Sequence, residues 1–172
     1  MLNNDLSQQI KRNFPYKPTE EQENAVKSFA EFLFSPSADS VFLMKGYAGT
    51  GKTTLISALV RTLDSLQRKV ILLAPTGRAA KVFSGYAGHP AYTIHKKIYR
   101  QKVFSNETDN FVANQNLHRN TLFIVDEASM IANEGLSGGH FGSGRLLDDL
   151  VQYVYNGLGC RLMLIGDTAQ LP

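Results

Sequence analysis

Short apolar runs alternate along the chain with longer segments in which apolar residues recur at helical spacing. Four runs are bounded by turn residues and predict buried strands, which cover residues 41–44, 70–73, 122–125 and 162–165. Helical spacing over 55–66 and 146–154 predicts two helices that pack on this sheet, with Gly157 placed to end the second. Strands that alternate with helices are typical of α/β proteins, so we expect a mostly parallel sheet with helices on both faces.

A further helix is expected to begin near Thr19. Thr19 and Gln22 fit the T-x-x-Q capping box, in which each side chain bonds to the backbone of the other residue. The residues that follow place five apolar side chains on one helical face: Ala25, Val26, Phe29, Phe32 and Leu33. Residues 35–40 are rich in Ser, Pro and Asp and predict the loop to the first strand.

Two segments interrupt this alternation. Residues 103–105 and 111–113 are short β-type runs around a turn-rich pentapeptide, which is consistent with a small inserted β-hairpin at about 102–114 or with a plain surface loop. Residues 135–144 are glycine-rich and predict a flexible insertion.

Length and composition narrow the class of protein. A chain of 172 residues, 43% of them hydrophobic and 19% charged, suits one globular domain over 1–172. The only cysteine, Cys160, cannot form an internal disulfide, so it suits a reducing compartment. The first residues lack the pattern of a secretion signal, and no apolar run approaches the roughly 18 residues of a membrane span. We therefore expect a cytoplasmic domain that does not enter a membrane.

The charge is unevenly distributed. The net charge is only +3, but nine cations crowd one stretch in which Asp64 is the only acid. They are Arg61, Arg68, Lys69, Arg78, Lys81, Lys96, Lys97, Arg100 and Lys102. This stretch is a candidate polyanion surface, with a solvated basic face as the alternative.

Residues 46–53, GYAGTGKT, match the phosphate-binding pattern G-x-x-x-x-G-K-[ST] between a predicted strand and a predicted helix. Glycines let the backbone N–H groups surround a phosphate, and the helix N-terminus adds partial positive charge. Lys52 is expected to bind the β- and γ-phosphates of ATP, and Thr53 to bind Mg²⁺. The alternative is a glycine-rich turn with an incidental lysine. The predicted ATP-binding residues here are Gly46, Gly49, Thr50, Gly51, Lys52, Thr53 and Thr54.

Polar residues also follow two later strands. Asp126 and Glu127 come directly after the strand 122–125, where Asp126 can hold Mg²⁺ and Glu127 can deprotonate a water for attack on the γ-phosphate. The alternative is an acidic pair that starts a helix. Gln170 follows the last strand and could sense the γ-phosphate or position its water, or be a polar turn residue.

The order of these motifs resembles superfamily 1 DNA helicases of the RecD-like and Dda-like branch. The matching segments are 46–53 (motif I), 74–81 (motif Ia), 93–95 (motif Ib), 126–129 (motif II) and 166–172 (motif III). The resemblance implies a RecA-like P-loop motor domain that hydrolyses ATP with Mg²⁺ and binds single-stranded DNA. It also implies that Gln22 reads the adenine in addition to capping its helix.

By the same resemblance, Thr76, Thr93 and His95 touch the DNA backbone, with Lys96 beside them. The hairpin candidate falls where such helicases carry a pin that splits duplex, and Phe104 or Phe111 could meet a base there. Taken by itself, a histidine such as His95 is more often structural. The remaining histidines lack metal-ligand spacing, so we expect no zinc site.

The family pattern continues into a second RecA-like domain that carries an arginine finger, whereas this chain ends at Pro172. A missing arginine finger costs about 10³ to 10⁵ in rate, so we expect the chain alone to bind ATP and hydrolyse it slowly. We therefore expect a fragment of a longer motor, or else a stand-alone module. Two other functions carry the same phosphate loop: a small-molecule P-loop kinase and a nucleotide-dependent docking module.

Overall fold

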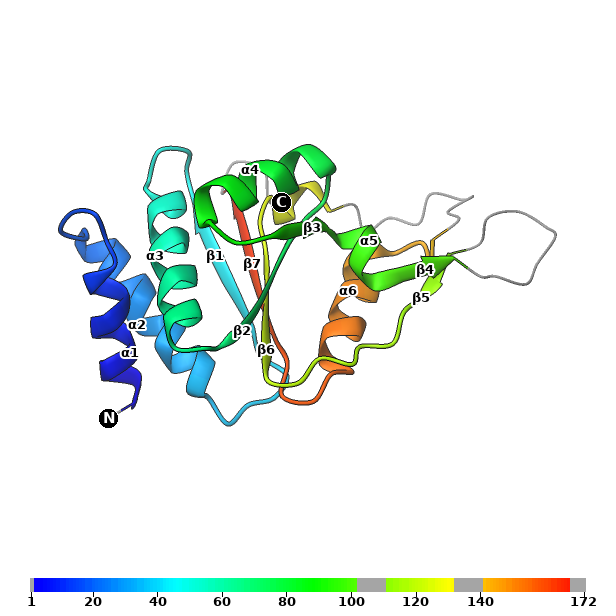
Figure 1. Cartoon of the computed structure of the whole chain (residues 1–172), viewed down its shortest axis with the longest axis horizontal. Helices are drawn as coiled ribbons and strands as arrows, with labels where there is room; N and C mark the ends of the chain where they lie inside the picture. The colour runs from blue at the N-terminus through cyan, green and yellow to red at the C-terminus, as the bar shows by residue number, and fades with distance from the viewer. Residues whose placement is uncertain (1, 102–110, 132–140, 168–172) are drawn as a thin grey trace.

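A five-stranded parallel sheet forms the centre of the protein (Figure 1). The computed structural model describes residues 2–101, 111–131 and 141–167. The strand order is β1 (Val41–Gly46), β7 (Arg161–Asp167), β6 (Thr121–Val125), β2 (Lys69–Ala74) and β3 (Ala91–Thr93). All four predicted strands are confirmed. The fifth strand, β3, escaped prediction because it has only three residues and an exposed side chain, Tyr92.

Helices cover both faces of the sheet, as the alternating pattern predicts. One face packs against α2 (Glu20–Phe34), α3 (Lys52–Ser65) and α4 (Gly77–Ala87), and α1 (Leu2–Arg12) packs on α2 and α3. The other face packs against α5 (Ile94–Ile98) and α6 (Leu146–Tyr155), and the short 3₁₀ helix η1 (Ala128–Met130) follows β6. The sequence pattern missed α1, because only two of its side chains, Leu6 and Ile10, are buried.

The predicted start of α2 is confirmed. The Thr19 hydroxyl accepts a hydrogen bond from the Gln22 backbone N–H (3.3 Å), and the Gln22 side-chain oxygen accepts one from the Thr19 backbone N–H (3.0 Å). Phe29 and Phe32 are buried and contact the ring of Phe42 on β1, with centroids 5.7 and 5.4 Å away. The apolar face of α2 thus fixes this helix against the edge of the sheet.

β1 is less buried than its apolar run predicts. Val41 is 40% exposed and Leu43 is 48% exposed, whereas Phe42 and Met44 face the core. The difference arises because β1 is an edge strand, and successive side chains of a strand point to opposite faces. Only the face beneath α2 is covered at this edge.

A second, two-stranded sheet projects beside α5. β4 (Tyr99–Gln101) pairs antiparallel with β5 (Phe111–Ala113), which confirms the base of the predicted hairpin. The first strand lies before the run 103–105 that suggested it. That run, with the rest of 102–110 and therefore Phe104, lies outside the described residues.

The predicted flexible insertion differs from the structure at its last four residues. Phe141 stacks on Phe111, with ring centroids 4.4 Å apart. The side chain of Asp149 accepts hydrogen bonds from the Ser143 hydroxyl (2.6 Å) and the Tyr99 hydroxyl (2.6 Å). Burial opposes ionisation of Asp149, but these bonds hold its pKa below the ordinary value. Residues 141–144 are therefore tied to the hairpin base, while 135–140 lie outside the described residues.

Candidate nucleotide-binding site

Three segments that are distant in sequence meet at the carboxyl edge of the sheet. The register of β1 and β7 pairs Gly46 with Asp167, and β6, the neighbour of β7, leads directly into Asp126. Carboxyl ends of parallel strands share one edge, where ligands of such sheets bind. Here they surround a pocket of about 520 Å³. Its lining includes Gly49, Lys52, Tyr86, Asp126, Glu127 and Asp167.

The phosphate loop lies between β1 and α3, as predicted. Gly49 and Gly51 adopt positive φ angles of 82° and 79°, which other residues rarely adopt. A side chain at Gly51 would also displace the Gln22 amide, so the positive φ favours glycine there and the close contact adds to that preference. The turn starts α3 at Lys52 and directs its first turn at the pocket.

The Lys52 side chain is held by the phosphate loop and by the end of β7. Its ammonium donates to the carbonyls of Gly46 (2.6 Å) and Tyr47 (2.8 Å) and forms an ion pair with Asp167 (2.6 Å). The partnership with Asp167 joins residues 115 positions apart in the sequence. Asp167 lies inside the predicted motif 166–172, but the motif gave it no predicted role. The signal that could have found it was its position at the end of the last strand.

Asp126 is fixed by two hydrogen bonds. One carboxylate oxygen accepts from the Tyr86 hydroxyl (2.6 Å), and the other accepts from the backbone N–H of Glu127 (2.8 Å). Burial, followed by the charge of Asp126, raises the pKa of Tyr86, so its hydroxyl remains a donor at neutral pH. Tyr86 is not among the predicted site residues, because only the packing of α4 on β2 and β3 brings its hydroxyl to Asp126, 40 positions away.

Glu127 combines an unusual backbone with an unusual environment. Its φ of 54° lies in the left-handed region, a conformation that clusters at functional sites. Burial raises its pKa above the ordinary value, and the charges of Asp126 and Asp167 raise it further, against the opposing effect of Lys52. A carboxylate with a raised pKa is a better proton acceptor than an ordinary glutamate.

The remaining predicted nucleotide-binding residues surround this centre. Thr53 is exposed and lines the pocket, whereas the Thr54 hydroxyl accepts a hydrogen bond from Tyr16 (3.0 Å). The buried Gln22 caps α2, and its amide nitrogen lies 3.5 Å from the Gly51 carbonyl. Gln22 thus contacts the phosphate loop while it makes the capping box. Gln170 lies outside the described residues.

Two of the predicted DNA-binding residues cap helices at the same edge. The Thr76 hydroxyl accepts from the Ala79 backbone N–H at the start of α4, and the Thr93 hydroxyl accepts from that of Lys96 at the start of α5 (3.2 Å each). The strands before them are neighbours, since Ala74 pairs with Thr93. Thr76 also lines a second pocket of about 600 Å³, and this pocket shares Asp126 and Glu127 with the first.

His95 and Lys96 have different surroundings. The half-buried His95 ring lies against Tyr99 and Phe141, with centroids 5.8 and 5.0 Å away, and burial lowers its pKa. Lys96 is exposed. His95 therefore joins the aromatic residues at the hairpin base as a neutral ring at neutral pH.

Comparison with known proteins identifies the family. A family model described as an AAA domain matches residues 17–172. The chain belongs to this AAA domain family. Within it, the relatives place the chain among the RecD-like helicase motor domains of superfamily 1, which bind ATP. The fold agrees, because this AAA domain is a RecA-like P-loop α/β domain.

Three relatives illustrate the similarity. The ATP-dependent RecD2 DNA helicase of Deinococcus radiodurans is 31% identical over 83% of the chain, and the ATP-dependent DNA helicase dda of Enterobacteria phage T4 is 37% identical over 51%. The uncharacterized protein MJ1519 of Methanocaldococcus jannaschii is 29% identical over 89%. The match with this chain covers only 18% of the RecD2 helicase, 20% of dda and 13% of MJ1519.

Other features of this AAA domain concern metals and membranes. The described ranges hold no group of three or more His, Cys, Asp and Glu side chains that could bind a metal ion, and the absence of zinc remains a prediction. No described helix has both the length and the apolar character needed to span a membrane.

Replacing Lys52 tests the phosphate loop. Lys52→Ala removes the only ammonium group that lines the described pocket, so MgATP affinity should fall below detection in a titration with a fluorescent ATP analogue. Lys45→Ala is the matched control, because Lys45 is an exposed lysine on β1. Undiminished affinity of Lys52→Ala would contradict the assignment.

Proposed function

We propose that this AAA domain is the ATP-binding and ATP-hydrolysing half of a DNA helicase motor that translocates on single-stranded DNA and unwinds duplex. The observation that carries the proposal is the convergence of Lys52, Glu127 and Asp167 on one pocket at the carboxyl edge. The second half of the motor would be another RecA-like domain. The names of the two helicase relatives support this assignment.

Lys52 is proposed to exchange partners when ATP binds. The β- and γ-phosphates carry more charge than the loop carbonyls, so they compete for the ammonium that Gly46, Tyr47 and Asp167 now hold. The exchange would leave the Asp167 charge uncompensated near Glu127. Because Asp167 raises the pKa of Glu127 and Lys52 lowers it, ATP binding would strengthen Glu127 as a base.

Glu127 is the proposed general base, which takes the proton from the water that attacks the γ-phosphate. Thr53 and Asp126 offer the oxygen ligands that Mg²⁺ prefers, and Tyr86 fixes the orientation of Asp126. When bound there, Mg²⁺ would neutralise phosphate charge. Gln170, in the motif after β7, is the proposed sensor of the γ-phosphate.

The other loop residues are proposed to hold the rest of the nucleotide. The backbone of Gly46, Gly49, Thr50 and Gly51 would surround the phosphates, followed by Thr54 on the first turn of α3. Gln22 is proposed to read the adenine edge. Its contact with the phosphate loop supports this role, since the capping box fixes the amide beside Gly51.

The single strand is proposed to cross the carboxyl edge over Thr76, Thr93, His95 and Lys96. Two hydroxyls, a neutral imidazole and an exposed ammonium can contact phosphates without reading sequence. Thr76 shares a pocket with Asp126 and Glu127. This supports a coupling of DNA binding to ATP hydrolysis, because single-stranded DNA at Thr76 would lie next to these two carboxylates.

Glu127→Gln tests the hydrolytic step. The amide keeps the shape of the side chain but cannot accept the proton, so MgATP binding should persist while hydrolysis slows by about 10² to 10⁴-fold. Single-turnover hydrolysis of radiolabelled ATP measures this. The control is Glu31→Gln, which alters an exposed glutamate on α2. A wild-type rate would remove Glu127 from the mechanism.

The pH dependence of kcat/KM provides a second test. The base must be ionised, and the pKa of Glu127 is raised above 4.5, so activity should fall with decreasing pH at a higher pH than for an ordinary glutamate. Asp167→Asn removes a charge that raises this pKa and should move the acidic limb to lower pH. An acidic limb that does not move in the variant would show that a different group controls it.

Binding of labelled oligothymidylate tests the DNA assignment. Fluorescence anisotropy at two salt concentrations, with and without a non-hydrolysable ATP analogue, should show binding that weakens with salt and changes with nucleotide. Lys96→Gln should lower the slope of log affinity against log salt by about 0.7, the contribution of one single-strand phosphate contact. The exposed Lys27 on α2 gives the control variant, Lys27→Gln. An absence of DNA binding in a chain that binds MgATP would count against the proposal.

A further inference from the structure

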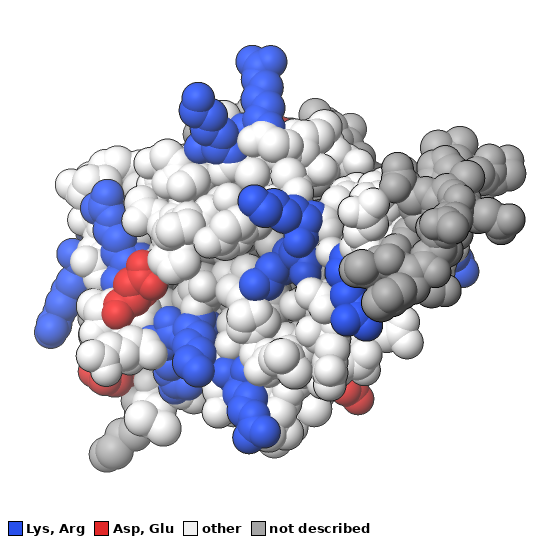
Figure 2. All heavy atoms as spheres, turned by 45° about the vertical axis from the view of Figure 1, so that its right-hand side comes forward, with Lys and Arg blue, Asp and Glu red and all other residues white. Residues whose placement is uncertain are grey.

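A basic surface extends well beyond the residues proposed for the single strand. Between positions 66 and 125, the described residues include eight Lys and Arg and no Asp or Glu. The eight are Arg68, Lys69, Arg78, Lys81, Lys96, Lys97, Arg100 and Arg119. Figure 2 shows Lys and Arg side chains spread across the face on the side of β3, α5 and β4, with few acidic ones.

Four of these cations form a basic strip, defined as Lys69, Lys97, Arg100 and Arg119. Arg100 lies on β4 at the hairpin base, and Lys97 lies on the preceding helix. Arg119 precedes β6 by two residues, and Lys69 starts β2 opposite Thr121 of β6. Burial lowers the pKa of His118, and the charges of Lys97 and Lys69 lower it further, since both lysines lie near the segment that carries His118 and Arg119.

The strip is electrostatically uncompensated within the described ranges. None of its four cations belongs to an ion pair there. Among the described residues, the acids nearest in sequence have other partners: Asp64 lies 3.6 Å from His89, and Asp126 accepts from Tyr86. The strip therefore presents positive charge to solvent.

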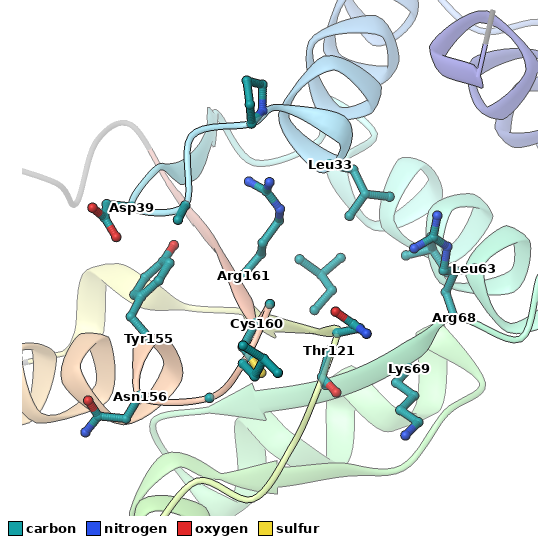
Figure 3. Close-up of a pocket in the computed structure, with 17 residues that line it drawn as sticks. Leu33, Asp39, Leu63, Arg68, Lys69, Thr121, Tyr155, Asn156, Cys160 and Arg161 are labelled. Carbon is teal, nitrogen blue, oxygen red and sulfur yellow. The ribbon is translucent and has the colours of Figure 1, made fainter.

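Lys69 also lies at the rim of a pocket of about 570 Å³ at the amino edge of the sheet (Figure 3). Two polar side chains of this pocket are bonded to backbone carbonyls of the loop that precedes β1. Arg161 donates to the Ser35 and Ser37 carbonyls, and Tyr155 donates to the Ser40 carbonyl. These bonds hold the loop before β1 against α6 and β7. Lys69 remains exposed on the outer surface.

The strip begins next to the proposed path of the single strand, since Lys97 follows Lys96 on α5, but its Lys69 end lies away from that path. Thr93 pairs with Ala74 at the carboxyl end of β2, whereas Lys69 is five residues earlier on the same strand. At about 3.3 Å per residue, the two ends lie about 17 Å apart. This length corresponds to about five base pairs of duplex, at 3.4 Å per step along each strand.

We propose that the basic strip binds the phosphate backbone of double-stranded DNA. The inference rests on the proposed function and adds a second contact surface to it, running from the hairpin base to the amino edge. The four positive charges of the strip attract the negative phosphates of the duplex, and binding through phosphates needs no contact with the bases. A duplex that reaches the hairpin base would lie along the strip while one of its strands enters the carboxyl edge.

The aromatic residues beside the strip favour duplex over single-stranded DNA. Sequence-independent binding of single strands uses aromatic side chains on which bases stack. The exposed Tyr92 is near the strip, but the Lys97 ammonium lies over its ring at 6.0 Å. Within the described residues the strip therefore offers cations for phosphates rather than open rings for bases.

The test is a charge reversal far from the carboxyl edge. Lys69→Glu with Arg119→Glu removes two phosphate contacts, so affinity for a labelled blunt duplex should fall about tenfold or more at low salt, and the salt slope should fall by about 1.8. Affinity for oligothymidylate and for MgATP should stay within about twofold. The matched control is Lys17→Glu with Lys27→Glu, which makes the same charge change at and just before α2, beside the opposite edge strand β1.

Three results of the binding experiments would overturn the inference. Undetectable duplex binding by the unsubstituted chain, or an equal loss in the control pair, overturns the inference. An equal loss of oligothymidylate affinity assigns the strip to the single-strand path and also overturns it. Because MgATP and single-strand binding are measured separately, failure of the strip is distinguished from failure of the proposed function. Lys69→Gln with Arg119→Gln repeats the test without adding acids.

Discussion

The parallel register of β1, β7 and β6 is the constraint on which the candidate site depends. It brings Gly46, Asp167 and Asp126 to one edge, although they belong to distant parts of the chain. A shift of one residue would turn every side chain of a strand to the other face, so the buried side chains of β6 and β7 would be exchanged between the two hydrophobic clusters that cover the sheet. The hydrophobic core thus sets the geometry of the polar site.

Lys52 links the phosphate-binding loop to the acidic residues of the site. The Lys52 ammonium is bonded to two carbonyls and to Asp167, so the cation expected to meet phosphates already has partners. Glu127 lies close enough for Asp126, Asp167 and Lys52 all to affect its pKa. In the proposed mechanism, a ligand that draws Lys52 away therefore changes the basicity of Glu127 without any large movement of the backbone.

The hairpin base is attached to the domain by side chains from three segments. His95, Phe111 and Phe141 are in ring contact, and Tyr99 shares Asp149 with Ser143. This cluster connects α5 with β4, β5 and the start of α6. Under the proposed function, it would fix the hairpin relative to the residues that hold the single strand, while the basic strip lies on the outer side of the same region.

The α/β class, the four longer strands, the capping box of α2 and the position of the phosphate loop could all be predicted from the sequence. These features follow from periodicity and from short motifs, which are local in the chain. Strand β3 and helix α1 have too few apolar residues to give such a pattern. Three features could not be predicted and depend on how the chain packs: the edge position of β1, the ion pair of Asp167 with Lys52, and the hydrogen bond from Tyr86 to Asp126. The physical reason is that these contacts join residues between 40 and 115 positions apart, and no local pattern records which distant side chains packing brings together.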